Sequence, residues 1–320
     1  MRGKKGVAIC THAPLAIPNS NFLTWHRFVE WMEYQIMIGI DVIIMPYPMK
    51  ISKFPLPDEI DRALHYYVKK GHLRMMDLPY YREGHSGITQ ESNAIYRISS
   101  WSKLFHMTHC YLKHALEFEH ILSLDLDEVP GFHADRPPNI SEAISSMKAA
   151  LGSSGAQKSF QMRDRIMIVS SVCTKHLKLD TSWQNGTVDE HFAILNARYA
   201  YAKAYHPGKQ IINTDVCVFL HLHGCDSYLP ISEKEHFKAQ YSFDSINKPL
   251  DLQIANESGI YLNHYRTLKC EKSNLESCCL KHGDEIQDNF NLNNIRLLKK
   301  RIRTVAAELN FTTTLRSDTL

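Results

Sequence analysis

The first 130 residues alternate between short apolar runs and longer stretches in which apolar residues recur at helical spacing. The helical pattern covers residues 20–38, a second stretch from residue 57 to residue 71, and a long segment that passes through residues 98–116. Short apolar runs between these stretches predict buried strands at residues 7–10, 41–45, 72–77 and 120–124. Strands that alternate with helices predict a mostly parallel sheet with helices on both faces.

The pattern changes in the second half of the chain. Apolar and polar residues alternate over residues 160–168, as on a half-buried strand, and segments 192–197 and 216–223 predict further strands. Residues 291–309 predict a closing helix. Because no repeat or low-complexity linker divides the chain, we expect an α/β fold in one continuous domain, with a mostly parallel central sheet flanked by helices and a smaller mixed-sheet lobe.

Composition excludes several classes of protein. Hydrophobic residues make up 44% and charged residues 22% of the 320 positions, which argues against a disordered chain. The net charge of +3 does not favour nucleic acid as a partner, and the basic run at residues 299–301 is typical of a solvated helix face. The most apolar stretch, residues 36–45, is interrupted by Asp41. We therefore expect no membrane anchor in this chain.

The cysteines and the glycosylation triplets point weakly to the secretory pathway. None of the eight cysteines forms a C-x-x-C motif. Cys270 lies close to Cys278 and Cys279 in a polar segment, which suits a short disulfide loop, while a set of reduced, buried thiols is the alternative. Asn-x-Ser/Thr triplets occur at Asn139, Asn185, Asn256 and Asn310. Asn139 also suits a helix N-cap, with Glu142 three residues later.

The strongest chemical signal is the acidic segment Asp125-Leu-Asp-Glu128, directly after the apolar run that ends at Leu124. If the strand continues, Asp125 and Asp127 point to one side and Glu128 to the other. Ligands bind at the carboxyl ends of strands in open α/β sheets. Two adjacent carboxylates there favour a hard divalent cation and a diphosphate, whereas a solvated acidic loop is the alternative.

Histidine and arginine supply two further candidates. His221 and His223 share one face of a predicted strand, so one imidazole could complete a metal site formed by the carboxylates. Half-exposed strand histidines are the alternative. His264, Tyr265 and Arg266 form a compact group of hydrogen-bond donors, in which Arg266 suits a diphosphate or a structural ion pair.

Some motifs are missing from the sequence. It contains no G-x-G-x-x-G, P-loop, G-x-S-x-G or H-E-x-x-H pattern, so dehydrogenase, NTPase, α/β-hydrolase and zincin functions have no support. A metal-dependent phosphoesterase built on the same acidic and histidine residues is a further alternative, although such an enzyme needs a denser set of Asp and His motifs.

Taken together and in order over about residues 6–290, several segments resemble glycosyltransferase family 92. These segments are Phe28–Tyr34, Ile38–Asp41, Leu124–Glu128, Lys209–Asn213, His223–Gly224 and His264–Arg266. The chain departs from the family pattern at Gln35, where a histidine is usual, at Val129 after the acidic segment, and at Asn213-Thr214.

The resemblance implies a GT-A fold, a nucleotide-sugar donor, a divalent metal that is usually manganese, and inverting galactosyl transfer. It implies that Asp127 binds the metal directly, that Asp125 binds the ribose or the metal through water, and that His223 is a further ligand. The nucleotide sugar would also contact Lys209, His264 and Arg266, with the uracil near Thr11 and His12. The base that activates the acceptor is expected at Asp226, with Asp189 and Glu190 as rivals.

The sequence and the resemblance together predict a metal-dependent enzyme that moves galactose from UDP-galactose to a glycan hydroxyl as a β-linkage, in the Golgi lumen. We expect the glycosyltransferase domain over residues 1–290, with a nucleotide-sugar half at 1–130 and an acceptor half at 131–290. Residues 291–320 would form the closing helix and tail. The alternative is a GT-A-fold protein that has lost turnover and binds glycans or a partner protein.

Overall fold

The structure is a computed structural model that describes thirteen segments of the chain. They are residues 4–11, 24–46, 56–76, 104–132, 139–150, 160–167, 192–196, 199–202, 209–220, 225–228, 260–265, 285–287 and 292–312.

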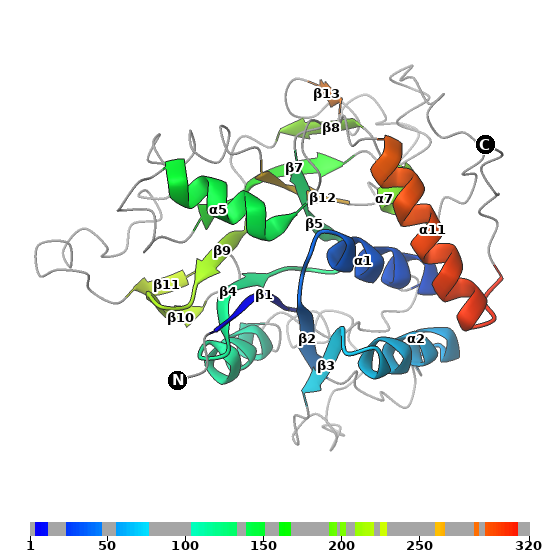
Figure 1. Ribbon diagram of the computed structural model, residues 1–320, viewed down its shortest axis with the longest axis horizontal. Helices are drawn as coiled ribbons and strands as arrows, with labels where there is room; N and C mark the ends of the chain where they lie inside the picture. The colour runs from blue at the N-terminus through cyan, green and yellow to red at the C-terminus, as the bar shows by residue number, and fades with distance from the viewer. Residues whose placement is uncertain are drawn as a thin grey trace, which may run out of the picture.

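A six-stranded central sheet has the order β3-β2-β1-β4-β9-β6 (Figure 1). The four parallel strands are β1 (Lys5–Cys10), β2 (Val42–Pro46), β3 (Leu73–Met76) and β4 (Phe118–Ser123). The two strands added in antiparallel orientation beyond β4 are β9 (Gln210–Asn213) and β6 (Phe160–Gln161). The parallel βα pattern predicted for the first 130 residues is confirmed, and so is the α/β fold class, which is consistent with a GT-A-like fold.

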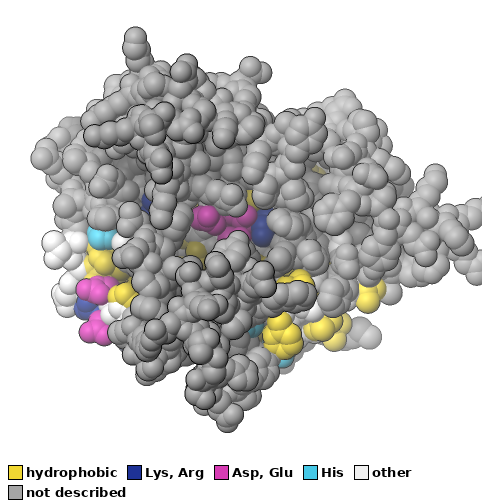
Figure 2. Space-filling model, turned by 180° about the vertical axis from the view of Figure 1, so that it is seen from behind, with side chains coloured by type: hydrophobic (Ala, Val, Ile, Leu, Met, Phe, Trp, Pro, Cys, Tyr) yellow, Lys and Arg dark blue, Asp and Glu magenta, His cyan; other side chains and the backbone are white. Residues whose placement is uncertain are grey.

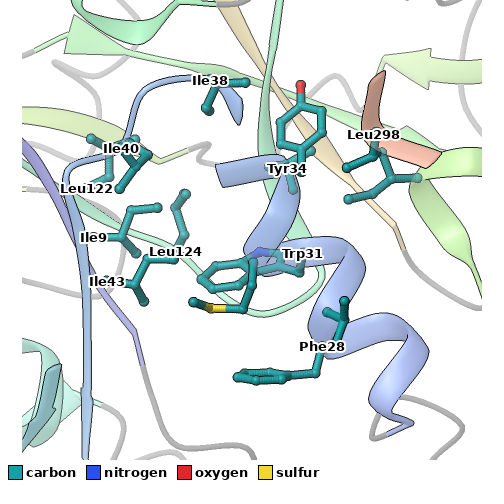
Figure 3. Close-up of a cluster of buried hydrophobic side chains, with 14 of the residues drawn as sticks. Ile9, Phe28, Trp31, Tyr34, Ile38, Ile40, Ile43, Leu122, Leu124 and Leu298 are labelled. Carbon is teal, nitrogen blue, oxygen red and sulfur yellow. The ribbon is translucent and has the colours of Figure 1, made fainter. Parts of the chain in front are cut away.

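Helices cover both faces of the central sheet. Since successive residues of a strand point to opposite faces, each strand contributes to two separate cores. Val7 and Ile9 of β1 join one core with residues of α1 (Trp25–Met37), α2 (Asp58–Lys69), α5 (Ile140–Ala150) and α11 (Leu292–Glu308). Ala8 and Cys10 join a second core with the helix at residues 104–114. Figure 3 shows Trp31 of α1 facing Ile9, Ile43 and Leu124 in the first core.

A second, mixed sheet has the order β13-β8-β7-β12-β5. Its strands are β5 (Glu128–Phe132), β7 (Arg163–Met167), β8 (Tyr199–Ala202), β12 (Ile260–His264) and β13 (Glu285–Gln287). β12 pairs antiparallel with β5 and parallel with β7. Val129 and Phe132 of β5 belong to the same core as α1, so the two sheets pack around one shared helix. The predicted smaller mixed-sheet lobe is thereby confirmed.

Two strand predictions need correction. Residues 193–196 form the short helix α7 (Ala193–Asn196) and not a strand. Ile194 and Leu195 are buried in the core beside α1, and the carboxylate of Glu30 accepts a hydrogen bond from the Leu195 backbone N–H over 2.7 Å. A short apolar run has the same pattern in a buried strand and in a buried helix, so periodicity could not separate them. The strand predicted at 216–223 is shorter, β10 (Cys217–Leu220), and residues 221–224 lie outside the described segments.

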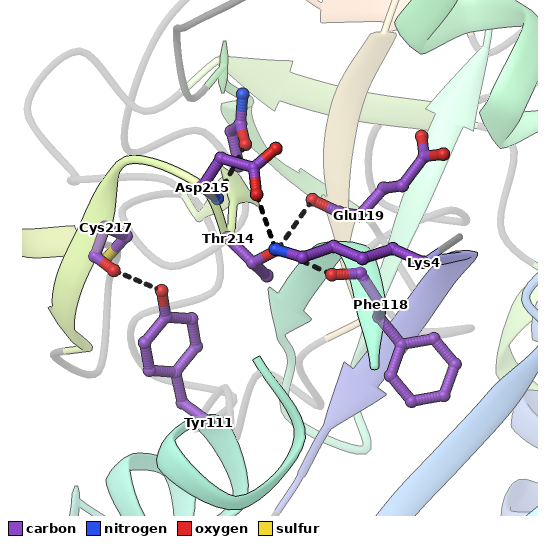
Figure 4. Close-up of polar contacts among 8 residues, drawn as sticks. Lys4, Tyr111, Phe118, Glu119, Thr214, Asp215 and Cys217 are labelled. Atoms are coloured by element: carbon purple, nitrogen blue, oxygen red, sulfur yellow. Dashed lines mark hydrogen bonds and ion pairs between the residues drawn. The ribbon is translucent and has the colours of Figure 1, made fainter. Parts of the chain in front are cut away.

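Polar contacts tie β9 and the following hairpin to the sheet (Figure 4). The hydroxyl of Thr214 donates to the Phe118 carbonyl over 2.5 Å, and the ammonium of Lys4 reaches Thr214 at 2.8 Å and Asp215 at 2.6 Å. Tyr111 donates its hydroxyl hydrogen to the Cys217 carbonyl over 2.6 Å. These contacts fix the position of β9, directly after Lys209, and of the hairpin between β10 and β11 (Cys225–Tyr228).

The four cysteines in the described segments form two disulfides, Cys10–Cys110 and Cys217–Cys225. The first joins the end of β1 to the helix at 104–114, and the second closes the β10–β11 hairpin. For these four residues the alternative of reduced thiols is wrong. The predicted bridge from Cys270 to Cys278 or Cys279 lies outside the described residues. The expected N-cap is confirmed, because the Asn139 side-chain oxygen accepts from the backbone N–H groups of Ser141 and Glu142.

Candidate active site

The acidic segment forms a turn that joins the two sheets. β4 of the central sheet ends at Ser123, and β5 of the second sheet begins at Glu128. The Glu128 backbone N–H donates to the Asp125 carbonyl over 3.1 Å, which closes a tight turn. The expectation that Asp125 and Asp127 continue a strand and point to one side by alternation is therefore wrong. The segment does lie at the carboxyl edge of the parallel strands, as predicted.

Helix α1 holds this turn from the core side. The Trp31 indole N–H donates to the Glu128 carbonyl over 2.8 Å, and the Gln35 amide reaches the same oxygen at 3.4 Å. The Tyr34 hydroxyl donates to the Pro130 carbonyl over 2.6 Å. These are buried hydrogen bonds, which cost free energy to lose because the freed carbonyl would have no water to replace its partner. The turn is therefore fixed by side chains of a packed helix.

Beneath the turn, Glu128 is paired with Lys209. The Glu128 carboxylate accepts a hydrogen bond from the Asp125 backbone N–H over 2.9 Å and lies 3.4 Å from the Lys209 ammonium nitrogen. The same nitrogen is 3.8 Å from the Asp125 carboxylate. Burial alone lowers the pKa of an ammonium group. Attraction by Glu128 first, and by Asp125 next, outweighs burial and raises the pKa of Lys209 above its ordinary value.

The charges of the site lie in two layers. The side chains of Lys209 and Glu128 are only 3% and 4% exposed, whereas that of Asp125 is 17% exposed and Asp127 is half-buried. Figure 2 shows acidic side chains in a hollow near the centre of one face, with a basic side chain beside them. In the inner, buried layer Lys209 compensates part of the negative charge. The outer layer, Asp125 and Asp127, offers carboxylate oxygens to a ligand.

Thr11 lies beside the acidic turn. Leu124 donates its backbone N–H to the Cys10 carbonyl over 3.3 Å, and Thr11 donates its own to the Ile44 carbonyl over 3.0 Å. The ends of three neighbouring strands therefore meet here. The Thr11 side chain is fully buried, and its hydroxyl oxygen has no hydrogen-bond partner among the described residues. A buried polar atom without a partner is unusual away from a functional site.

The model of one protein family, glycosyltransferase family 92, matches residues 6–311. This chain belongs to glycosyltransferase family 92. No curated protein matches the chain at a significant level. The match covers nearly the whole sequence and includes both sheets and their helices, apart from the first residue of β1, so glycosyltransferase activity is assigned to the fold as a whole.

The structure brings some of the predicted site residues of this glycosyltransferase together. Besides Asp125, Asp127, Lys209 and Thr11, it places the backbone of His264 directly opposite Glu128 in the β5–β12 pair. The Tyr265 backbone N–H donates to the Asp127 carbonyl over 2.7 Å, so the third motif does reach the acidic turn.

The remaining predicted residues are placed less fully. Asp226 lies on β11, whose first residue Cys225 donates its backbone N–H to the side chain of Gln210, next to Lys209. His12, Asp189, Glu190, His221, His223 and Arg266 lie outside the described residues.

Sequence reasoning missed one charged residue of this glycosyltransferase. Arg27, in the first turn of α1, is half-buried, and its charge interacts with Glu30 on the same helix and with Asp127. Burial lowers the pKa of the Arg27 guanidinium, although both carboxylates act in the opposite direction. The only signal in the sequence was a positive charge between the apolar positions of α1, which is normally a sign of a solvent-facing position.

The chemistry of the outer layer fits a divalent cation. Asp125 and Asp127 supply oxygen ligands of the kind that manganese and magnesium prefer, and both side chains are partly exposed. Within the described segments no group of three or more His, Cys, Asp or Glu side chains converges on one point, because Glu128 is turned toward Lys209. Two carboxylates leave the other coordination positions of an ion to a diphosphate, to water or to a further residue.

Among the described helices, none is both long enough and apolar enough to cross a bilayer.

Proposed function

We propose that this protein transfers galactose from UDP-galactose to a glycan hydroxyl in a metal-dependent, inverting reaction that forms a β-linkage. The observation that carries this proposal is the acidic turn, with two partly exposed carboxylates at the carboxyl edge of a parallel sheet and a buried lysine beside them. Membership of the family supports the reaction class, and the choice of galactose rests on the sequence resemblance.

In this proposal Asp127 holds the divalent ion directly, and Asp125 binds the donor ribose or a water of the ion. His223 is proposed as a further ligand. When bound, manganese would supply a positive charge that stabilises the UDP leaving group. The fixed turn between β4 and β5 keeps the two carboxylates in place before the donor arrives, so little ordering is needed when it binds.

The protein's own residues divide the remaining work. Thr11 and His12 are proposed to contact the uracil. The buried hydroxyl of Thr11, which has no hydrogen-bond partner within the described segments, supports a polar ligand near this point. His264 and Arg266 are proposed to contact the diphosphate. Lys209 is proposed to assist donor binding indirectly, because its positive charge offsets part of the negative charge of Asp125 and Glu128.

The acceptor side needs a base that removes a proton from the attacking hydroxyl. Asp226 is the proposed base, with Asp189 and Glu190 as alternatives. A single displacement then inverts the anomeric carbon. A double displacement would require a carboxylate nucleophile beneath that carbon, and the sequence offers no second acidic motif with this character. Nuclear magnetic resonance of the product should therefore give the coupling constant of a β-anomer.

We propose that the protein acts in the secretory pathway, in the Golgi lumen. The two disulfides in the described segments support an oxidising compartment, since such bonds are rare in the cytosol.

A donor screen tests the proposed function. Purified protein is incubated with individual UDP-sugars and a galactose-terminated acceptor, with either manganese or EDTA, and released UDP is measured. We expect UDP release from UDP-galactose that requires both manganese and the protein. No turnover or binding with any nucleotide sugar would contradict the proposal and favour a glycan- or partner-binding protein. Hydrolysis of simple phosphate esters without sugar transfer would favour a phosphoesterase.

A further inference from the structure

Arg27 is a cation held at the edge of the acidic turn. It lies in the first turn of α1, which begins after Thr24, and the Thr24 hydroxyl accepts a hydrogen bond from the Arg27 backbone N–H over 3.3 Å. The guanidinium Nε atom is buried and has no hydrogen-bond partner among the described residues. The helix cap thus fixes the backbone of Arg27, and packing removes part of its side chain from water.

The charge of Arg27 is not explained by an ion pair within the described residues. Among the described residues Arg27 forms no salt bridge, and Glu30 and Asp127 influence its charge only from a distance. Arg27 lies one helical turn before Trp31, whose indole N–H donates to the Glu128 carbonyl, so both side chains leave α1 on the face that meets the acidic turn. Glu30 accepts a hydrogen bond from the Leu195 backbone N–H over 2.7 Å and so holds α7. A structural role for a partly buried arginine normally involves direct contact with a carboxylate, because burial of a charge is costly without one.

An anion held between Arg27 and the metal ion proposed at Asp127 would explain this arrangement. The guanidinium presents planar N–H donors that match the oxygens of a phosphate in a two-bond geometry, and it stays charged even when partly buried. The acidic turn alone would repel a phosphate. With the divalent ion on one side and Arg27 on the other, two positive charges make phosphate binding favourable.

We propose that Arg27 binds the diphosphate of the nucleotide-sugar donor from the α1 side, opposite the carboxylates of Asp125 and Asp127. This inference rests on the proposed function and adds a phosphate-binding residue to it. Arg27 would orient the two phosphates and stabilise the negative charge that appears on them when the bond to the sugar breaks.

The test compares UDP with uridine, because only UDP carries the phosphates. Binding of each to the full chain is measured by isothermal titration calorimetry in the presence of manganese, for the wild type, Arg27→Gln and Arg27→Lys. The control is Arg296→Gln, which removes an exposed arginine from α11. We expect Arg27→Gln to weaken UDP binding by about 10- to 100-fold, the usual effect of losing a charged hydrogen bond. Uridine binding should not change, Arg27→Lys should recover part of the loss, and Arg296→Gln should match the wild type.

Circular dichroism during heating separates a binding role from a structural one. Because Arg27 lacks a direct ion pair in the described segments, we expect Arg27→Gln to unfold at the same temperature as the wild type or higher. Wild-type UDP binding by both Arg27 variants would overturn the inference and leave the proposed function intact. Equal loss of UDP and uridine binding would also overturn it. A wild-type protein that binds no UDP would contradict the inference and the proposed function together.

Discussion

The indole nitrogen of Trp31 donates a hydrogen bond to the backbone carbonyl of Glu128 over 2.8 Å. Trp31 is also part of the core that joins α1 to the central sheet and to β5. One side chain therefore connects the packing of the fold to the turn that carries the candidate site. The Tyr34 hydroxyl, on the same helix, likewise donates a hydrogen bond to the carbonyl of Pro130, two residues further along β5.

Replacement of Trp31 by Phe should loosen the turn. The phenyl ring still packs in the core, but the Glu128 carbonyl keeps only the longer contact to Gln35, at 3.4 Å. We expect the free energy of unfolding to fall by about 1–3 kcal/mol and UDP binding to weaken. Tyr67→Phe is the matched control, because it removes a buried hydrogen bond to Glu33, away from the turn. Urea denaturation and calorimetry measure the two effects. Equal UDP affinity in both variants would show that Trp31 does not position the site.

Lys209 should contribute strongly to the stability of the fold. Its replacement by Met leaves the Glu128 carboxylate buried without its cation, so we expect the free energy of unfolding to fall by about 3–5 kcal/mol. The double variant Lys209→Met with Glu128→Gln should regain part of that loss, because the neutral amide no longer needs a cation. Denaturation of the two single variants and the double variant gives the coupling energy. A Lys209→Met protein as stable as the wild type would refute a paired role.

His120 should make the stability depend on pH. It is buried in β4, and burial, together with the nearby charge of Lys148, lowers its pKa from 6.5 to about 4, while Asp215 opposes this shift. Protonation therefore favours the unfolded chain. The contribution of His120 is fully present above about pH 6.5 and is lost as the pH falls toward about 4, by up to roughly 3 kcal/mol.

The variant His120→Leu should remove this part of the pH dependence, as measured by urea denaturation between pH 4 and pH 7. If the free energy of unfolding of the variant changes with pH as steeply as that of the wild type, other groups cause the pH dependence.

The two disulfides should differ in their effect on stability. Cys10–Cys110 joins residues 100 positions apart, and Cys217–Cys225 joins residues 8 positions apart. In the chain-entropy description the longer loop contributes about 4.7 kcal/mol and the shorter about 2.5 kcal/mol. We expect the double alanine variant of the first pair to melt at a clearly lower temperature than that of the second. The reverse order in differential scanning calorimetry would show that packing around the sulfurs dominates.

The sequence predicted the central sheet because its signals are local. Each parallel strand is a short apolar run, each helix has a clear stripe, and the acidic segment follows directly after a strand. It could not predict α7, since the apolar run at 193–196 is short and its backbone donates a hydrogen bond, from Leu195, to the carboxylate of Glu30, far away in the chain.

The rest of the site depends on contacts between distant segments. No local pattern indicates that Cys10 pairs with Cys110, because disulfide connectivity cannot be deduced from cysteine positions. Arg27 was overlooked for a similar reason. Its significance appears only when β5 packs against α1 and brings Asp127 near the start of that helix. Lys209 was selected by family resemblance, and its partners Glu128 and Asp125 became visible only with β9 placed beside β4.

The most direct test of the account is the activity of Asp127→Ala with manganese present. Release of UDP from UDP-galactose is measured for the wild type, for Asp127→Ala and for the control Asp58→Ala, which removes an exposed carboxylate from α2. Circular dichroism shows whether each variant is folded. The account predicts that folded Asp127→Ala loses at least about 100-fold in manganese-dependent turnover, while the control retains it. Near wild-type turnover by folded Asp127→Ala would contradict the assignment of the acidic turn as the active site.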